Sequence, residues 1–125
     1  MVCDSNIVIY AAEPEDTICR PFLEDQQAMI ASVTRIEVLG FPGFSGLDHE
    51  RQNRLHSFVA STTEAVLDEE IIKRAVTLRQ QKKMGLGDSI IAAIVLAYSV
   101  PLVTRNEADF KHIAGLQIIN PFATA

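Results

Sequence analysis

The sequence has no tryptophan, only two cysteines and no apolar run long enough to cross a membrane. Its longest apolar stretch, Ile90 to Tyr98, is far short of the ~20 residues that a membrane helix needs. Cys3 and Cys19 have neither the spacing of a metal-binding pair nor the number for a disulfide framework, so we expect free thiols. The first residues are acidic, unlike a basic secretory signal. We therefore expect a cytoplasmic protein without membrane association.

Positive charge is also scarce. Lysine and arginine number 11 against 16 aspartates and glutamates, which leaves a net charge of −5. This balance argues against a protein that coats nucleic acid through a bulk positive field. It does not exclude an enzyme that gathers its acids at a metal site, because bound divalent cations would cancel charge there. The scattered histidines His49, His56 and His112 have no HxxxH spacing, and we interpret them as surface residues.

The 125 residues predict one compact domain over the whole range 1–125. Predicted strands alternate with predicted helices along the chain. The strands are expected at 1–3, 28–33, 64–67, 101–104 and 116–119, and the helices at 6–12, 17–26, 34–39, 48–60, 69–83, 89–99 and 107–112. The strands are mostly continuous apolar runs, which is typical of strands buried on both faces. This pattern predicts an α/β fold, a three-layer α/β/α sandwich with a mostly parallel sheet.

Four acids lie where such a fold would gather them. Asp4 directly follows the first strand, and Glu37 lies three residues after Thr34, where the helix after the second strand is expected to begin. Asp88 opens the apolar helix 89–99, and Asp109 follows the fourth strand by five residues. Ligands of open parallel sheets bind at the carboxyl ends of the strands. We therefore expect these four side chains to meet at one edge of the sheet.

Each acid also has a purely structural interpretation. Asp4 and Asp88 are good helix N-caps, Thr34 to Glu37 fits a capping box, and Asp109 resembles a solvated helix residue. The combination favours a site, because clustered carboxylates repel one another unless a cation separates them. Hard cations such as Mg²⁺ and Mn²⁺ prefer oxygen ligands and can activate water for phosphodiester cleavage. The sequence therefore predicts a metal-dependent hydrolytic site.

Four motifs in series resemble the PIN-domain family, and more narrowly the VapC-type toxins of toxin–antitoxin pairs. They are Asp4–Tyr10, the mid-chain Glu37, Gly85–Ala93 and Leu102–Phe110, and together they extend over the chain in the expected order. Two residues depart from the family pattern. Ser5 stands where threonine is common, and Ser89 stands where alanine is frequent. Both replacements keep a small residue, so we expect them to be tolerated.

This resemblance implies an endoribonuclease that hydrolyses RNA phosphodiester bonds with Mg²⁺ or Mn²⁺. It implies that the metal ligands and catalytic residues are Asp4, Glu37, Asp88 and Asp109. It also implies that the site is supported by Asn6, Thr104 and Asn106. Whether Asp109 or Asn106 completes the site stays open. Family members form homodimers and are held inactive by a cognate antitoxin protein, so we expect both kinds of partner.

Basic residues near the motifs have two possible roles. Arg35 and Arg105 each lie beside a motif, where a guanidinium group can clamp RNA phosphates or pair with a nearby acid. Both interpretations stay open. Lys82 and Lys83 come at the end of a predicted helix, where cations interact favourably with the helix dipole. Their spacing alone does not assign them to RNA.

Two other functions compete with the nuclease. The first is a PIN-like module that has lost catalysis and only binds a partner, which the complete set of acids argues against. The second is a phosphatase that uses Asp4 as its nucleophile. That chemistry usually needs a second aspartate two residues later, where this chain has Asn6. The sequence thus favours a metal-dependent endoribonuclease, the toxin of a toxin–antitoxin pair.

Overall fold

The computed structural model describes residues 1–123. Its five strands form one sheet with the order β3-β2-β1-β4-β5, and every neighbouring pair is parallel. The strands are β1 (Val2–Cys3), β2 (Met29–Ala31), β3 (Thr63–Ala65), β4 (Leu102–Val103) and β5 (Ile118–Ile119). Because β1 lies at the centre, the residue that follows it stands in the middle of the carboxyl edge of the sheet. The predicted parallel sheet is confirmed.

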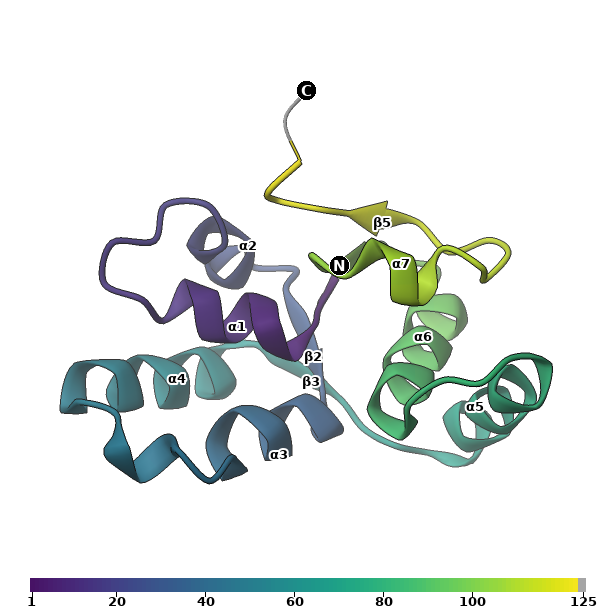
Figure 1. The fold of residues 1–125 in the computed structure, drawn as a ribbon, viewed down its shortest axis with the longest axis horizontal. Coiled ribbons are helices and arrows are strands. Elements are labelled where there is room, and N and C mark those ends of the chain that lie inside the picture. The colour runs from purple at the N-terminus through teal and green to yellow at the C-terminus, as the bar shows by residue number, and fades with distance from the viewer. Residues whose placement is uncertain (124–125) are drawn as a thin grey trace.

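Helices cover both faces of this sheet. They are α1 (Ser5–Ala11), α2 (Arg20–Glu24), α3 (Ser32–Gly40), α4 (His49–Ser61), α5 (Glu69–Gln81), α6 (Leu86–Tyr98) and α7 (Glu107–Phe110), with a 3₁₀ turn at Phe44–Gly46. Helices α1 to α4 lie on one side of the sheet and α5 to α7 on the other (Figure 1). The predicted three-layer α/β/α arrangement is therefore confirmed.

Alternation along the short strands divides the core into two parts. In β1, Val2 packs with the apolar residues of α5 and α6, whereas the next residue, Cys3, packs with those of α1 to α4. In β4, Leu102 and Val103 divide in the same way. Successive side chains of a strand point to opposite faces, so two residues per strand suffice to join the layers. Helix α6 is buried along most of its length, as its apolar sequence predicts.

The observed first residue of each helix shows which of the acids are N-caps. Asp4 is the N-cap of α1, and its Oδ1 atom accepts a hydrogen bond from Ile7 N at 3.1 Å, as expected. The capping box at Thr34 is wrong, because α3 begins at Ser32 directly after the extended Ala31. Asp88 as an N-cap is also wrong. Gly85 occupies that position without a side-chain hydrogen bond, and Asp88 lies in the first turn of α6.

Three helices are shorter than predicted, namely α2, α5 and α7, the last of which ends at Phe110. The carboxylate of Asp16 accepts hydrogen bonds from Cys19 N and Arg20 N, so residues 17–19 form a turn and α2 begins only at Arg20. Helix α5 ends at Gln81 because Lys82 takes an extended conformation (φ −157°, ψ 145°). None of the helices within residues 1–123 is long and apolar enough to span a membrane.

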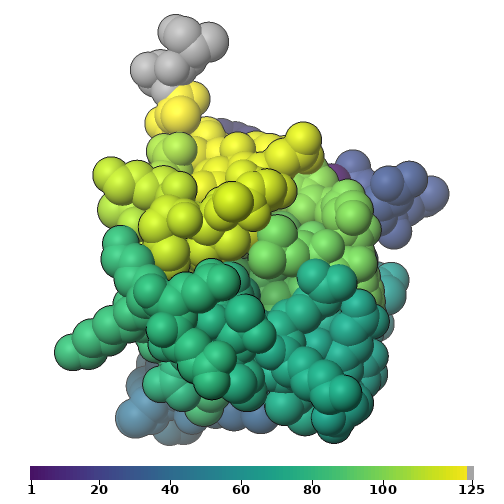
Figure 2. Space-filling view, turned by 90° about the vertical axis from the view of Figure 1, so that its right-hand side faces the viewer, coloured from purple at the N-terminus to yellow at the C-terminus, as the bar shows by residue number. Residues whose placement is uncertain are grey.

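Figure 2 views the molecule from the side that α5 covers. Helix α5 forms the lower part of this face, the residues after α7 form the upper part, and atoms of α6 are visible between them (Figure 2). On this face α5 packs over α6, which in turn packs against the sheet. The connection from α5 to α6, residues 82–85, therefore leads from the surface to the first turn of the central helix.

Candidate active site

The centre of the candidate site is Asp4, which is only 6% exposed. Its Oδ1 atom caps α1, and its Oδ2 atom accepts a hydrogen bond from the hydroxyl group of Thr104. Thr104 is fully buried and follows β4, whose register pairs Cys3 with Val103. Two residues 100 positions apart therefore meet because their strands are neighbours. Both carboxylate oxygens of Asp4 are fixed by these contacts.

Glu37 reaches the same region from α3. Its Oε1 atom accepts a hydrogen bond of 2.7 Å from Ser5 Oγ, which belongs to the first turn of α1. On its other side lies the first turn of α6. A Cβ atom added to Gly87 would be 3.6 Å from Glu37 Oε2, which is ordinary van der Waals contact. The Glu37 carboxylate thus lies between the N-terminal turns of α1 and α6, with an exposed side chain.

Asp88 and Asp109 come from the other layer of helices. Both line a cavity of about 200 Å³, with Asp88 partly buried in α6 and Asp109 exposed on α7. Burial raises the pKa of Asp88, and the negative charges of Asp109, Asp4 and Glu37 raise it further. The structure therefore brings the four predicted acids close enough for their charges to interact.

Asp4 experiences the same crowding of negative charge. Burial is the main cause that raises its pKa, and the charge of Glu37 adds to it. Hydrogen bonds from Thr104 and from the main chain of Ile7 act in the opposite direction, because they stabilise the ionised form. None of the four acids forms an ion pair with a lysine, arginine or histidine of the described residues.

The donor chemistry of the four acids fits a hard divalent cation. Carboxylate oxygens are the ligands that Mg²⁺ and Mn²⁺ prefer, and a bound cation would offset the repulsion that adds to burial in raising the pKa values of Asp4 and Asp88. The oxygens are not gathered into a finished ligand cluster. Within residues 1–123 no three acidic, histidine or cysteine side chains are arranged to hold a metal ion. Glu37 and Asp109 are both exposed, and Glu37 is held by the hydrogen bond from Ser5.

The three expected supporting residues differ in their contacts. Thr104 holds Asp4, as described above, and its Oγ1 atom also accepts a hydrogen bond of 3.0 Å from Asn106 N. Asn106 is the N-cap residue of α7, and its carbonyl oxygen accepts a hydrogen bond of 3.2 Å from Asp109 N. The main chain of Asn106 thus links Thr104 to Asp109. Asn6 is exposed on α1.

The two arginines near the motifs have different partners. Arg35 Nε lies 3.0 Å from Glu64 Oε1, so its charge is already paired. The guanidinium group of Arg105 lies 4.5 Å from the ring centre of Phe122 and 5.7 Å from that of Tyr10. Its Nη1 atom donates to the Tyr10 hydroxyl oxygen at 3.2 Å. Arg105 is therefore held by two aromatic rings, and within residues 1–123 it has no acidic partner.

Three basic residues near the acids were not predicted. Lys82, Lys83 and His112 line the same cavity as Asp88 and Asp109. The sequence offered one signal, since the two lysines precede Asp88 by only five and six residues and lie on the loop into its helix. His112 follows Asp109 by one helical turn. Their placement together depends on how α7 packs against α6, which no local pattern reveals.

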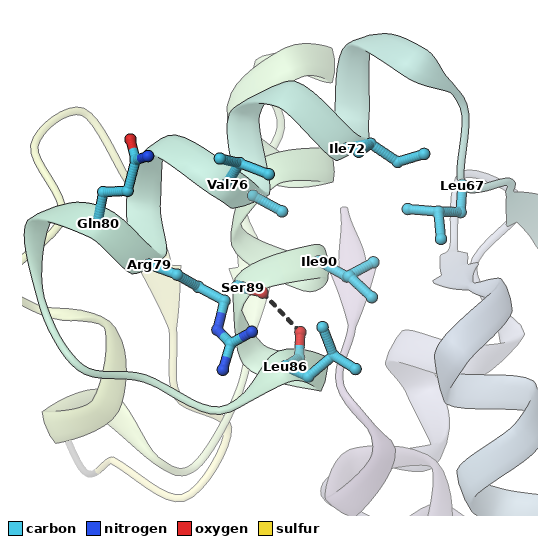
Figure 3. A pocket seen from close by; sticks show the side chains of 9 residues that line it. Leu67, Ile72, Val76, Arg79, Gln80, Leu86, Ser89 and Ile90 are labelled. Carbon is cyan, nitrogen blue, oxygen red and sulfur yellow. Dashed lines mark hydrogen bonds between the residues drawn. The ribbon is translucent and has the colours of Figure 1, made fainter.

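Another cavity has none of the four acids in its lining. It has a volume of about 440 Å³ and is formed mainly by α5 and α6. The side chains of Leu67, Ile72, Val76 and Leu86 surround it, and Ile90 closes its floor (Figure 3). These side chains carry no group for acid–base or metal chemistry. We call this feature the apolar groove and do not assign it to catalysis.

Known proteins resemble this chain in sequence and in fold. A toxin–antitoxin complex from Klebsiella pneumoniae contains a chain with 27% identity and a TM-score of 0.78, and the match covers 98% of both chains. VapBC2 from Rickettsia felis, solved with a promoter DNA fragment, has 22% identity and a TM-score of 0.77 over 95% of this chain and 96% of that one. VapBC-1 from nontypeable Haemophilus influenzae has 20% identity and a TM-score of 0.73 over 98% of both chains.

No curated protein sequence matches this chain significantly. The family model of the PIN domain matches residues 1–116, which is nearly the whole chain. That match covers β1 to α7 and all four candidate acids. The chain belongs to the PIN-domain family.

Proposed function

We propose that this protein is a metal-dependent endoribonuclease and the toxin of a toxin–antitoxin pair. One observation carries the proposal. Four carboxylates from four separate elements lie at the carboxyl edge of the sheet, interact through their charges and have no cationic partner among the described residues. A fold does not normally gather such a group unless a cation binds there.

Each acid has a distinct task in this proposal. Asp4, Glu37 and Asp88 are the core ligands of Mg²⁺ or Mn²⁺, and Asp109 completes the site directly or through water. When bound, the metal supplies positive charge that activates water and offsets the charge of the phosphodiester. Thr104 keeps the Asp4 carboxylate oriented and ionised through its hydrogen bond. Ser5 holds Glu37 in the same way.

The remaining polar residues act around this centre. Asn6 and Asn106 support the site, Asn106 by linking Thr104 to Asp109 through its main chain. Arg105 is the better of the two arginines for contact with RNA phosphates, because Arg35 is already paired with Glu64.

RNA cleavage tests the proposal. The wild-type protein, incubated with single-stranded RNA and Mg²⁺, should release shorter fragments, and an excess of EDTA should stop the reaction. Asp4→Asn should abolish cleavage, because it keeps the helix cap but removes the charge. Glu24→Gln is the matched control, since it removes one exposed acid of α2 that forms no ion pair with the described residues. Full activity of Asp4→Asn in Mg²⁺ would contradict the assignment.

The alternative is a PIN domain that only binds a partner. It predicts a folded wild-type protein that leaves RNA intact at every concentration of Mg²⁺ and Mn²⁺. The cleavage assay therefore separates the two functions.

Two protein partners belong to the proposal. The relative from Klebsiella was solved as a toxin–antitoxin complex, and we propose that an antitoxin also holds this chain inactive. We propose that a second copy covers the apolar groove. Leu67, Ile72, Val76 and Leu86 line it and are each more than two-fifths exposed. Light scattering should give a dimer for the wild-type protein and a monomer for Val76→Lys. A wild-type monomer would refute the homodimer.

A further inference from the structure

The small cavity beside the acids combines both signs of charge. Asp88 and Asp109 line it together with Lys82, Lys83 and His112. We propose that this cavity binds a phosphate group of the RNA strand next to the phosphate that is cleaved, with Lys82 and Lys83 as its main contacts and His112 as a third. This inference rests on the proposed nuclease function, because it names how the substrate of that site is held.

The two lysines are free to bind an anion. Five other basic residues form ion pairs with acids, namely Arg35, Arg51, Arg54, Lys73 and Arg74. Within residues 1–123, Lys82 and Lys83 have no acidic partner within 4.0 Å, although Asp88 and Asp109 line the same cavity. Five of the eleven lysines and arginines are thus already neutralised, whereas these two lysines are among those that keep their charge available within the described residues.

The connection that carries the lysines is held in place. Lys82 leaves α5 in an extended conformation, and Arg79 Nε donates a hydrogen bond of 3.3 Å to the carbonyl oxygen of Met84. The next residue, Gly85, also lines the cavity and is the N-cap of α6. Because no side chain caps α6, its first amide groups have no side-chain acceptor. Uncapped amides at a helix N-terminus favour anions, which adds to the attraction of the lysines.

The position also suits an extended substrate. A strand of RNA that reaches the four acids has to approach a region of negative charge, which repels its phosphates. The cavity offers positive charge beside this region, because Lys82 and Lys83 line it together with Asp88 and Asp109. Ammonium groups bind phosphates without reading bases, so this subsite would hold the backbone and not select a sequence.

A purely structural role for the lysines makes a different prediction. Cations at the C-terminus of α5 interact favourably with the helix dipole, by ~0.3–1 kcal/mol each at exposed sites. If this were their only role, their removal would lower the melting temperature slightly and leave RNA binding unchanged.

Binding of RNA separates the two roles. The test compares Lys82→Gln/Lys83→Gln with Lys73→Gln, which removes an exposed lysine of α5 that does not line the cavity. Both are made in the Asp4→Asn background, so that a fluorescent single-stranded RNA oligonucleotide stays intact in Mg²⁺. Fluorescence anisotropy should show about tenfold weaker binding for the double variant. The slope of log K against log salt should fall by about 1.4, since each contact to a single strand contributes about 0.7.

Kinetics with the otherwise wild-type protein give a second measurement. The double variant should raise KM about tenfold and leave kcat within twofold, as expected when binding is lost equally in ground state and transition state. His112→Ala should raise KM by a smaller factor. Unchanged anisotropy and unchanged KM, with only a lower melting temperature, would overturn the subsite. RNA binding that depends on the lysines, without any cleavage by the wild-type protein, would support the subsite and contradict the nuclease function.

Discussion

Replacing Asp88 with asparagine should change the stability of the protein in opposite directions with and without metal. Asp88 is partly buried, and its pKa is raised by that burial and by the charges of Asp109, Asp4 and Glu37. Its charged form is therefore destabilised in the folded protein relative to the unfolded chain. Asparagine has the same shape without the charge, so the metal-free variant should be more stable than the wild type.

The size of this effect follows from the exposure of the side chain. Its position in the first turn of α6 contributes a favourable interaction with the helix dipole, and solvent screens part of the repulsion. We expect a net gain of about 1 kcal/mol. The entropy of unfolding is about 2.1 cal/mol/K per residue. For the 125 residues of this chain, that gain corresponds to a rise of about 4 °C in Tm.

Metal should reverse the order of the two proteins. A ligand at a hundred times its Kd stabilises the folded state by about 2.7 kcal/mol, or about 10 °C for a chain of this size. The wild-type protein should gain this much in Mn²⁺, whereas Asp88→Asn should gain little because it lacks one ligand. Thermal melts followed by circular dichroism, in EDTA and in excess Mn²⁺, measure both effects. Glu24→Gln serves as the control and should behave as the wild type in both.

Two results would refute this reasoning. If Asp88→Asn is less stable than the wild type in EDTA, the acids do not repel one another as described. If both proteins gain equally from Mn²⁺, the metal does not bind at Asp88.

Three further predictions concern the raised pKa values of two acids, the hydroxyl group of Thr104 and the backbone conformation of Ser99. The pKa values of Asp4 and Asp88 are raised above their ordinary value of 3.8, so the folded state binds more protons than the unfolded state as pH falls from 7 toward 3.8. The wild-type protein in EDTA should therefore become more stable over this range. Denaturant melts of the double variant Asp4→Asn/Asp88→Asn should lack this gain. Thr104→Val should destabilise the protein by ~1–2 kcal/mol and weaken Mn²⁺ binding in calorimetry by ~10–100-fold, because the Asp4 carboxylate loses its hydroxyl donor, and unchanged Mn²⁺ affinity would contradict that role. Ser99 ends α6 in the left-handed conformation (φ 54°), which glycine adopts at lower cost. Ser99→Gly should therefore raise the free energy of unfolding, measured by urea titration, by ~1 kcal/mol. A loss of stability would show that the side chain of Ser99 matters more than its backbone strain.

Much of the fold could be predicted because its signals are local. The alternation of strands and helices, the apolar runs and the N-cap at Asp4 depend on neighbouring residues, and each agrees with the structure. The helix starts at Ser32 and Leu86 were missed for a physical reason. Ala31 is a poor N-cap and Gly85 a weaker one than aspartate, and stronger N-cap types, Thr34 and Asp88, follow three residues later. Backbone geometry at the end of each preceding segment decided the start instead.

The site was predictable as a set of acids but not as a set of contacts. The hydrogen bonds of Asp4 with Thr104 and of Ser5 with Glu37 join residues 100 and 32 positions apart. They exist because β1 pairs with β4 and α1 packs against α3, which only the complete topology determines. The same holds for the cavity that brings Lys82 beside Asp109. Thr34 shows the converse, since a residue that resembles a cap is buried with an unpaired hydroxyl group within the described residues.

The central claim is that four separated acids act as one nuclease site. It is tested most directly by RNA cleavage in Mg²⁺ with the four single variants Asp4→Asn, Glu37→Gln, Asp88→Asn and Asp109→Asn, and with the variant that carries all four changes. Residues that act as a unit lose their function together, so at least Asp4→Asn, Glu37→Gln and Asp88→Asn should each lose nearly as much activity as the quadruple variant. Near-wild-type cleavage by any of these three, or small losses that simply multiply to give that of the quadruple variant, would contradict the claim.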